Sequence, residues 1–290
     1  MMRILRFSRP LFLLLAALVY GMGTVLAGYL GNPISQIAFW VGLLGVLALQ
    51  AAMSLLSEVF RSLTDPLVQD ETIRIRKALH DEMLYTSAAA LAVFLVMFFL
   101  LFNRGDLSPH AILFFILEVG LVLVYAVPPV RLVNRGFGEL ILALHLGYLV
   151  PSLGFLLQAG EYHRLLALLV FPLVLLGLAC FLVLDFPTFS QDRKYNRGSM
   201  LVRIGWERAV PLHNLLIAAA YLILLASPLF KVSLTLVWPA FLTAPFALLQ
   251  VISLHAIARG GKPIWQLLQA TAIATFGLTA YFLTLTFWLK

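Results

Sequence analysis

Residues 163–194 read H-R-L-L-A-L-L-V-F-P-L-V-L-L-G-L-A-C-F-L-V-L-D-F-P-T-F-S-Q-D-R-K, an apolar run that ends directly in acidic and basic residues. About 20 apolar residues are enough for an α-helix to cross the hydrocarbon core of a membrane. Asp185 and Asp192 follow this run, and carboxylates held next to lipid are costly unless they have a role. The stretch therefore predicts a membrane-spanning helix with a polar site at one end.

The composition of the whole chain indicates a polytopic membrane protein. Of its 290 residues, 62% are hydrophobic and 11% are charged, and the mean hydropathy is +0.99. Soluble domains are nearer to half apolar and a quarter charged. No polar stretch is long enough to form a soluble domain, so we expect a single transmembrane domain over residues 1–290. The one cysteine, Cys180, lies in an apolar run and is expected to be a packing residue.

Nine stretches have the length and hydrophobicity of a membrane-spanning helix. They are residues 10–29, 34–56, 83–102, 110–127, 137–157, 163–184, 210–229, 232–257 and 265–289. We therefore expect an all-α membrane protein in which nine transmembrane helices form a bundle around a central cavity. Polar groups inside such a bundle usually find partners there, which we expect for His145 and Asn214. For Glu118 two alternatives stay open, a place near the outer boundary or a protonated carboxyl.

The Lys and Arg residues give the bundle an orientation. If the N-terminus is cytoplasmic, sixteen of the 20 fall in cytoplasmic segments. Such segments are enriched in basic residues, and one missed span would invert every later loop. We therefore expect a multi-pass protein with its C-terminus outside and its cavity open to the cytoplasm, in a bacterial plasma membrane. Because the basic residues follow topology, the net charge of +7 does not indicate nucleic acid as a partner.

The loop that follows residues 163–184 contains the first group of candidate metal ligands. Asp185, Thr188 and Asp192 are spaced i, i+3, i+7, so a helix that continues past the membrane presents them on one face. The sequence therefore predicts that Asp185 and Asp192 bind a metal ion and that Thr188 lies at the mouth of the cavity.

The loop after residues 34–56 contains the second group, in the sequence S-E-V-F-R-S-L-T-D from Ser57 to Asp65. Ser57, Arg61 and Asp65 are spaced i, i+4, i+8, which predicts a helical extension that Pro66 ends. Asp65 and the neighbouring Glu58 are the candidate metal ligands here.

Carboxylates next to many cations favour a site for Mg²⁺ and a diphosphate. Mg²⁺ prefers oxygen ligands and is usually held by one or two carboxylates together with substrate phosphates. Arg and Lys side chains bind phosphate oxygens, and the loops supply Lys77, Arg131, Arg135, Arg193, Lys194 and Arg197, with Arg74 and Arg76 nearby. Glu139 begins a span beside this mouth. Charged loop residues also serve as topology signals and helix caps, and that alternative stays open for each of them.

Three segments resemble the UbiA-type intramembrane prenyltransferases. Tyr125 to Leu140 read Y-A-V-P-P-V-R-L-V-N-R-G-F-G-E-L, similar to that family's Y-S-x-P-P-x-R-L-K-x-R-G-x-G-E-L. The loop from Asp185 resembles the family's second acidic motif, and residues 9–31 resemble its opening helix. The resemblance covers most of the chain. It implies nine helices with a cytoplasmic mouth, at which Tyr125 lies, a Mg²⁺ cofactor, and transfer of a prenyl group from an allylic diphosphate.

The chain departs from the family pattern at the metal ligands. The family's first motif is N-D-x-x-D-x-x-x-D, where this chain has Ser57, Glu58, Arg61 and Asp65. The central Asp of the second motif is Thr188. The resemblance thus implies a metal–diphosphate site with fewer ligands, in which Arg61 binds phosphate directly, because guanidinium binds phosphate in a bidentate manner.

Three hypotheses follow. The first is a Mg²⁺-dependent membrane prenyltransferase, with a polyprenyl diphosphate and a hydrophobic aromatic or lipid acceptor as partners in the bilayer. The second is a catalytically impaired family member that binds an isoprenoid lipid or a protein. The third is a transporter, which should have broken helices or polar residues near the membrane midplane. The sequence does not identify the acceptor, the prenyl chain length or the oligomeric state.

Overall fold

The computed structural model describes residues 2–68 and 71–290, and over these residues the chain is helical with no β-strand. Its α-helices are α1 (Met2–Phe7), α2 (Pro10–Tyr29), α3 (Gln36–Val59), α4 (Ile73–Asn103), α5 (Pro109–Ala126), α6 (Gly138–Leu144), α7 (Val150–Ala159), α8 (Arg164–Asp185), α9 (Phe189–Lys194), α10 (Met200–Ile204), α11 (Trp206–Leu225), α12 (Leu234–Val237), α13 (Ala244–Ala258) and α14 (Trp265–Leu289). The 3₁₀ segments are η1 (Leu132–Asn134), η3 (Phe186–Thr188), η4 (Ser227–Phe230) and η5 (Trp238–Thr243), and a π-helical turn, η2 (His145–Leu149), joins α6 to α7.

Nine helical segments of the described chain are long and apolar enough to cross a membrane, which confirms the predicted number. The third span starts earlier than predicted, the sixth continues to Lys194, the seventh lies at Trp206–Leu225 rather than 210–229, and the eighth is interrupted. α4 begins at Ile73 rather than at 83, because Thr72 caps the helix by accepting a hydrogen bond from the Ile75 amide at 3.2 Å. The eighth span is divided into α12, η5 and α13, because Pro239 and Pro245 lack the amide hydrogen that a regular helix needs.

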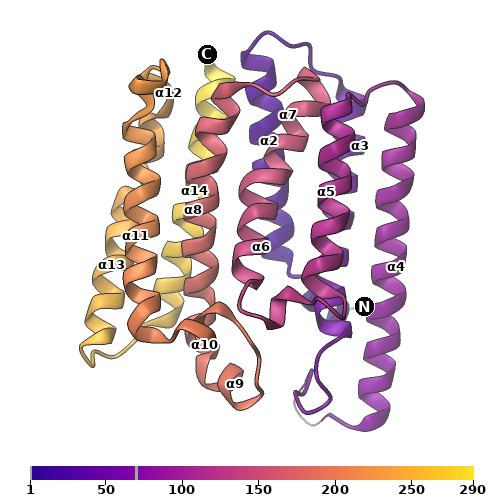
Figure 1. Cartoon of the computed structure of the whole chain (residues 1–290), viewed down its shortest axis with the longest axis vertical. Helices are drawn as coiled ribbons and strands as arrows, with labels where there is room; N and C mark the ends of the chain where they lie inside the picture. Colours follow the sequence, from indigo (N-terminus) through magenta and orange to yellow (C-terminus); the bar gives the residue numbers. More distant parts are fainter. Residues whose placement is uncertain (1, 69–70) are drawn as a thin grey trace.

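The helices stand side by side in one bundle (Figure 1). α3, α4 and α5 lie on one side of it, α11 and α13 lie on the other, and α2, α7, α8 and α14 lie between them. α2 and α7 are in close contact at Gly23, where a Cβ atom would overlap the Pro151 carbonyl oxygen. Only glycine allows this contact, which fixes the central pair of helices.

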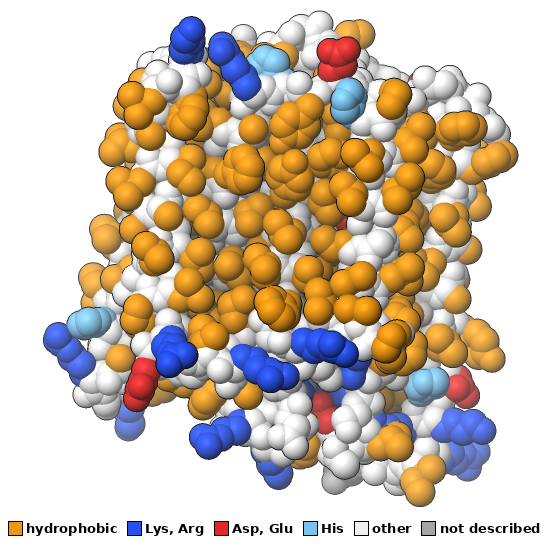
Figure 2. Space-filling model, viewed as in Figure 1, with side chains coloured by type: hydrophobic (Ala, Val, Ile, Leu, Met, Phe, Trp, Pro, Cys, Tyr) orange, Lys and Arg blue, Asp and Glu red, His pale blue; other side chains and the backbone are white. Residues whose placement is uncertain are grey.

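The two ends of the bundle differ in charge. Figure 2 shows an apolar band across the visible face of the molecule, with many Lys and Arg side chains below it and few above it. We call the lower end, where α3, α5 and α8 finish, the charged end. The N-terminus lies near it, as do α9 and α10, whereas the C-terminus lies at the opposite end (Figure 1). This arrangement is that of a membrane protein with one polar mouth.

The predicted helical extension through Ser57, Arg61 and Asp65 is wrong. α3 ends at Val59, and Arg61 and Asp65 lie in the loop beyond it. The loop is held instead by Arg76 of α4, which donates to four carbonyls of residues 61–65 at 2.7–3.4 Å. The backbone is therefore organised by hydrogen bonds from a distant side chain, which the local spacing of residues cannot reveal.

Glu118, His145 and Asn214 each have a side-chain partner in the spans, as expected for His145 and Asn214. Glu118 of α5 and His145 of η2 are both buried, and His145 Nδ1 lies 2.6 Å from Glu118 Oε2. Asn214 Oδ1 lies 3.1 Å from Nδ1 of its neighbour His213. Because a lone polar group in the bundle interior is costly, these contacts explain how the helices tolerate such residues.

Candidate functional site

A polar cavity of about 320 Å³ lies at the charged end, where the ends of α3, α5 and α8 meet the start of α6. Charged and polar side chains line its mouth, whereas Phe12, Leu142 and Phe181 form apolar wall deeper in the bundle. The Phe12 and Phe181 rings are 5.4 Å apart in an edge-to-face arrangement. The cavity thus joins a charged mouth to an apolar interior, which suits an amphipathic ligand.

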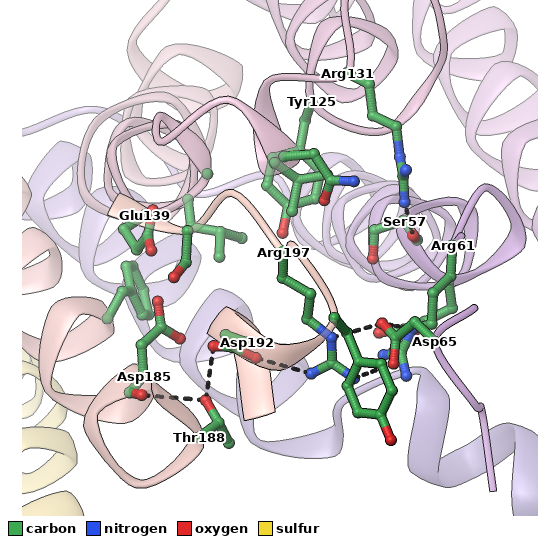
Figure 3. Close-up of a pocket in the computed structure, with 18 of the residues that line it drawn as sticks. Ser57, Arg61, Asp65, Tyr125, Arg131, Glu139, Asp185, Thr188, Asp192 and Arg197 are labelled. Carbon is green, nitrogen blue, oxygen red and sulfur yellow. Dashed lines mark hydrogen bonds and ion pairs between the residues drawn. The ribbon is translucent and has the colours of Figure 1, made fainter. Parts of the chain in front are cut away.

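The structure brings most of the predicted site residues together around this cavity (Figure 3). These residues are Glu58, Arg61, Asp65, Tyr125, Arg131, Glu139, Asp185, Thr188, Asp192 and Arg197. The other predicted cations lie elsewhere. Lys194 lines a neighbouring groove, while Lys77, Arg135 and Arg193 are exposed and are not part of the cavity wall.

Arg197 connects the two acidic loops. Its Nε and Nη2 atoms bind the two carboxylate oxygens of Asp65 at 2.6 and 2.7 Å, and its Nη1 atom donates to Asp192 Oδ1 at 2.9 Å (Figure 3). The hydrogen bonds to Asp65 raise the pKa of the Arg197 guanidinium, so it stays charged. A bidentate Arg–carboxylate pair is among the stronger and more directional ionic contacts. One guanidinium therefore lies between two predicted metal ligands.

Gly198 allows Arg197 to reach this position. A Cβ atom at residue 198 would overlap the carbonyl oxygen of Asn134, in the connection between α5 and α6. The backbone after α9 therefore lies directly against that connection, which only glycine permits.

The first loop contains a second carboxylate–guanidinium group. Glu58 forms ion pairs with Arg61 and with Arg9, whose Nη2 lies 3.2 Å from Glu58 Oε1. Arg61 also lies near Asp65, with 3.7 Å between Nε and Oδ2. In this structure both predicted metal ligands of the first loop are thus neutralised by arginines.

Arg9 is a site residue that the sequence analysis did not identify. It caps α2 in a left-handed conformation, with a φ of 52°, and lines the cavity beside Tyr125. The sequence does contain a signal, because Arg9 directly precedes Pro10 at the start of the first span, a position from which a side chain reaches the mouth. The positive charge of Arg9 also fits the rule that basic residues lie on the cytoplasmic side, so charge alone does not mark it as a site residue.

The second acidic loop has the predicted one-sided arrangement. α8 continues through the turn η3 into α9, and the Thr188 hydroxyl lies 3.1 Å from the Asp185 carbonyl oxygen and 3.0 Å from Asp192 Oδ2. The hydroxyl thus occupies the place between the two aspartates. Thr188 cannot supply a carboxylate, but it orients Asp192 toward the cavity (Figure 3).

Asp185 lies beside Glu139 of α6, and the charge of Arg9 also acts on it. The two carboxyl groups are close enough to interact, and Asp185 forms no ion pair within residues 2–68 and 71–290. Glu139 Oε1 accepts a hydrogen bond from the Met200 amide at 2.8 Å, while its buried Oε2 atom has no hydrogen-bond partner among the residues that the structure describes. Two neighbouring carboxyl groups need a shared proton or a cation.

Arg131 offers a donor that the protein does not use. Its Nη2 atom donates to the Ser57 carbonyl at 3.2 Å, whereas its buried Nε has no partner within the described chain. Burial lowers the pKa of the Arg131 guanidinium, and the charge of Glu58 opposes that effect. An unpaired N–H of a cation in a cavity wall is a ready contact for an anion.

Comparison with known families identifies this architecture. The model of the UbiA prenyltransferase family matches residues 13–272. The chain belongs to the UbiA prenyltransferase family. Among curated proteins, none matches it by sequence. The family match confirms the resemblance to this family, and its range includes every cavity residue named above except Arg9 and Phe12.

Several solved structures share the UbiA fold with this chain. A UbiA homolog from Archaeoglobus fulgidus, bound to DMAPP and Mg²⁺, is 17% identical, with a TM-score of 0.66 over 96% of this chain and 98% of that one. The apo UbiA homolog from Aeropyrum pernix K1 is 13% identical, with a TM-score of 0.61 over 94% and 96%. A structure of digeranylgeranylglyceryl phosphate synthase is 16% identical, with a TM-score of 0.62 over 100% and 98%.

The protein alone supplies an incomplete ligand set for a metal ion. Within residues 2–68 and 71–290, no three Asp, Glu, His or Cys side chains are grouped to hold one. Mg²⁺ does not need such a group, because one or two carboxylates together with phosphate oxygens suffice. The pair formed by Asp185 and Glu139, with the unpartnered Glu139 oxygen, fits this requirement. Glu58 and Asp65 fit it less well, since arginines already neutralise them.

Proposed function

We propose that this UbiA family member is an intramembrane prenyltransferase that depends on Mg²⁺. It transfers the prenyl group of an allylic diphosphate to a hydrophobic acceptor, aromatic or lipid. The observation that supports this most directly is the cavity itself, which combines guanidinium groups and free carboxyl oxygens at its mouth with an apolar interior. DMAPP and Mg²⁺ are bound together by the Archaeoglobus fulgidus homolog, which supports the same ligands here.

We assign the two sides of the mouth different roles. Asp185 and Asp192, the predicted ligands of the second loop, would hold Mg²⁺ together with the diphosphate, with Glu139 beside Asp185. When bound, Mg²⁺ would neutralise the charge that develops on the leaving diphosphate. Arg61 and Arg131 would donate hydrogen bonds to the diphosphate oxygens, since guanidinium groups match phosphate geometry. Arg61 would thus contribute a positive charge at a position where the family has a metal-binding aspartate.

In the reaction, the bond between the allylic carbon and the diphosphate oxygen breaks, and its electron pair leaves with diphosphate. The acceptor forms a new bond to that carbon and loses a proton. The apolar wall that includes Phe12, Leu142 and Phe181 would surround the prenyl chain and exclude water from the allylic cation.

The placement of the protein in the cell is part of the same proposal. The positive-inside rule puts the charged end on the cytoplasmic side, where soluble prenyl diphosphates and Mg²⁺ are available. The N-terminus would then be cytoplasmic and the C-terminus outside, in a bacterial plasma membrane.

The test is diphosphate release by the purified protein in nanodiscs. Geranyl, farnesyl and geranylgeranyl diphosphates would be offered with a mixture of aromatic and glycerol-lipid acceptors, with and without Mg²⁺. We expect release that requires Mg²⁺ and that is abolished in the double variant Asp185→Ala/Asp192→Ala. Glu161→Ala is the matched control, because Glu161 is exposed at the opposite end of α8.

Two other outcomes would contradict the proposal. Binding of a prenyl diphosphate without any release would indicate a family member that keeps its pocket and lacks the chemistry. Release that persists in the double variant would show that Asp185 and Asp192 are not the metal ligands.

A further inference from the structure

A second, larger hollow lies on the side of the bundle, between α8 and α11, with a volume of about 1000 Å³. Its wall on α8 consists of residues spaced by three, four or seven positions, and such residues share one helix face. These are Arg164, Ala167, Leu168, Phe171, Val174 and Leu175. The end of α11 and the hairpin that follows it complete the wall with Leu222, Ile223, Ala226, Leu229, Phe230, Lys231 and Val232. We call this hollow the lateral groove.

The lateral groove is separate from the cavity at the charged end. It begins at Arg164, at the first residue of α8, whereas Asp185 at the last residue of α8 lines the cavity. The groove spans Arg164 to Leu175 along α8, which at 1.5 Å per residue is about 16 Å. The hydrocarbon core of a bilayer is about 30 Å thick. The groove therefore has the length of one leaflet, with its open side toward lipid.

Two unpaired cations mark the polar end of the groove. Arg164 and Lys231 are exposed, and neither side chain forms an ion pair or a side-chain hydrogen bond with any residue that the structure describes. Lys231 is fixed at the tip of the hairpin in a left-handed conformation, with a φ of 58°. The remaining wall is made of aliphatic and aromatic side chains and backbone.

The other two cations at this end of the bundle are already engaged. Arg104 Nε binds Asp106 Oδ2 at 2.8 Å, and Lys290 Nζ donates to the Thr235 carbonyl at 3.2 Å. The free positive charge at this end is thus concentrated at the groove. In Figure 2, a few Lys and Arg side chains lie just beyond the apolar band at the upper end of the molecule. This is the depth at which lipid headgroups would lie.

We propose that the lateral groove is a binding site for one anionic glycerophospholipid, whose phosphate lies between Arg164 and Lys231 and whose acyl chain lies along Phe171 and Leu175. The charge complementarity between two unpaired cations and one phosphate selects an anionic headgroup. The leaflet-length apolar wall matches an acyl chain. The site is independent of the prenyl transfer reaction, since it shares no residue with the cavity at the charged end.

The test is lipid binding by native mass spectrometry of the purified full chain, after delipidation and titration with phosphatidylglycerol or with phosphatidylcholine. We expect one tightly bound phosphatidylglycerol per chain and weaker binding of phosphatidylcholine. In Arg164→Gln/Lys231→Gln, the affinity for phosphatidylglycerol should fall roughly 25-fold, because each basic side chain near anionic lipid contributes about fivefold. The matched control, Arg104→Gln/Lys290→Gln, removes the same charge from the same end and should leave binding unchanged.

A variant that keeps the charges tests the apolar wall. Ala167→Trp places an indole in the groove and should also remove the bound phosphatidylglycerol, while diphosphate release at the opposite end persists as a sign of correct folding. The proposal is overturned if the two double variants bind phosphatidylglycerol equally, or if phosphatidylcholine binds as tightly. It is equally overturned if the groove is covered by a second copy of the chain, seen as a dimer that Ala167→Trp dissociates.

Discussion

Arg197 and Asp65 form a bidentate ion pair, with distances of 2.6 Å from Nε to Oδ2 and 2.7 Å from Nη2 to Oδ1. The two residues come from loops more than a hundred residues apart in sequence, and their pairing ties the first acidic loop to the second. Asp65 is buried, so its charge needs a fixed partner. The Arg197–Asp65 pair therefore both stabilises the charged end and fixes the positions of the predicted metal ligands Asp65 and Asp192.

Replacement of Arg197 by alanine should lower both stability and activity. Asp65 and Asp192 would lose their shared partner, and leaving buried acceptors unsatisfied costs about 1–3 kcal/mol. Thermal unfolding in detergent measures the first effect and diphosphate release the second. The control is Arg193→Ala, which removes an exposed neighbouring cation outside the cavity wall. Equal unfolding temperatures for the two variants would show that the pair contributes nothing to stability.

Replacement of Arg61 by alanine should weaken the binding of the diphosphate. A hydrogen bond to a charged group is worth about 1.5–3 kcal/mol, which corresponds to roughly 10- to 150-fold in affinity. Titration of geranyl diphosphate by calorimetry, with Mg²⁺ present, measures this change. Arg74→Ala is a suitable control, because Arg74 is an exposed cation on α4. Unchanged affinity in Arg61→Ala would mean that Arg61 serves only to neutralise Glu58 and Asp65.

The nine spans could be predicted from the sequence because hydrophobic length and the distribution of basic residues are properties of short stretches. The one-sided arrangement of Asp185, Thr188 and Asp192 was also predicted correctly, since α8 continues through η3 into α9. In both cases the decisive interactions are local in sequence, between residues that are one or two helical turns apart.

The first acidic loop could not be predicted in the same way. Its conformation depends on Arg76, which lies beyond the loop and binds four of its carbonyls. Likewise, the contact of Arg197 with Asp65 depends on how two distant loops approach each other. The charge of a loop residue also predicts too many cations for the cavity wall. Lys77, Arg135 and Arg193 are basic, but they lie outside that wall. These features depend on contacts between residues that are distant in sequence, and the spacing of residues within one loop does not reveal such contacts.

Replacement of Gly198 by alanine should disturb the site without changing any charged group. The added methyl group would overlap the Asn134 carbonyl oxygen, so one of the two loops must move. Overpacking of this kind costs about 1–3 kcal/mol, and the movement would displace Arg197. We expect a lower unfolding temperature and a loss of diphosphate release. Gly120→Ala is the control, because a Cβ atom at Gly120 meets no atom within 4 Å. Full activity in Gly198→Ala would show that the close contact of the loops is not needed.

The orientation of the bundle can be tested with single cysteines. Cys180 is buried, so the natural chain should react poorly with a membrane-impermeant maleimide. Glu161→Cys adds an exposed thiol next to the start of α8, and Ser190→Cys adds one in α9 at the charged end. Because basic residues concentrate on the cytoplasmic side, intact cells should label Glu161→Cys only, and Ser190→Cys should react after permeabilisation. The reverse pattern would place the charged end, and with it the prenyl diphosphate site, outside the cell.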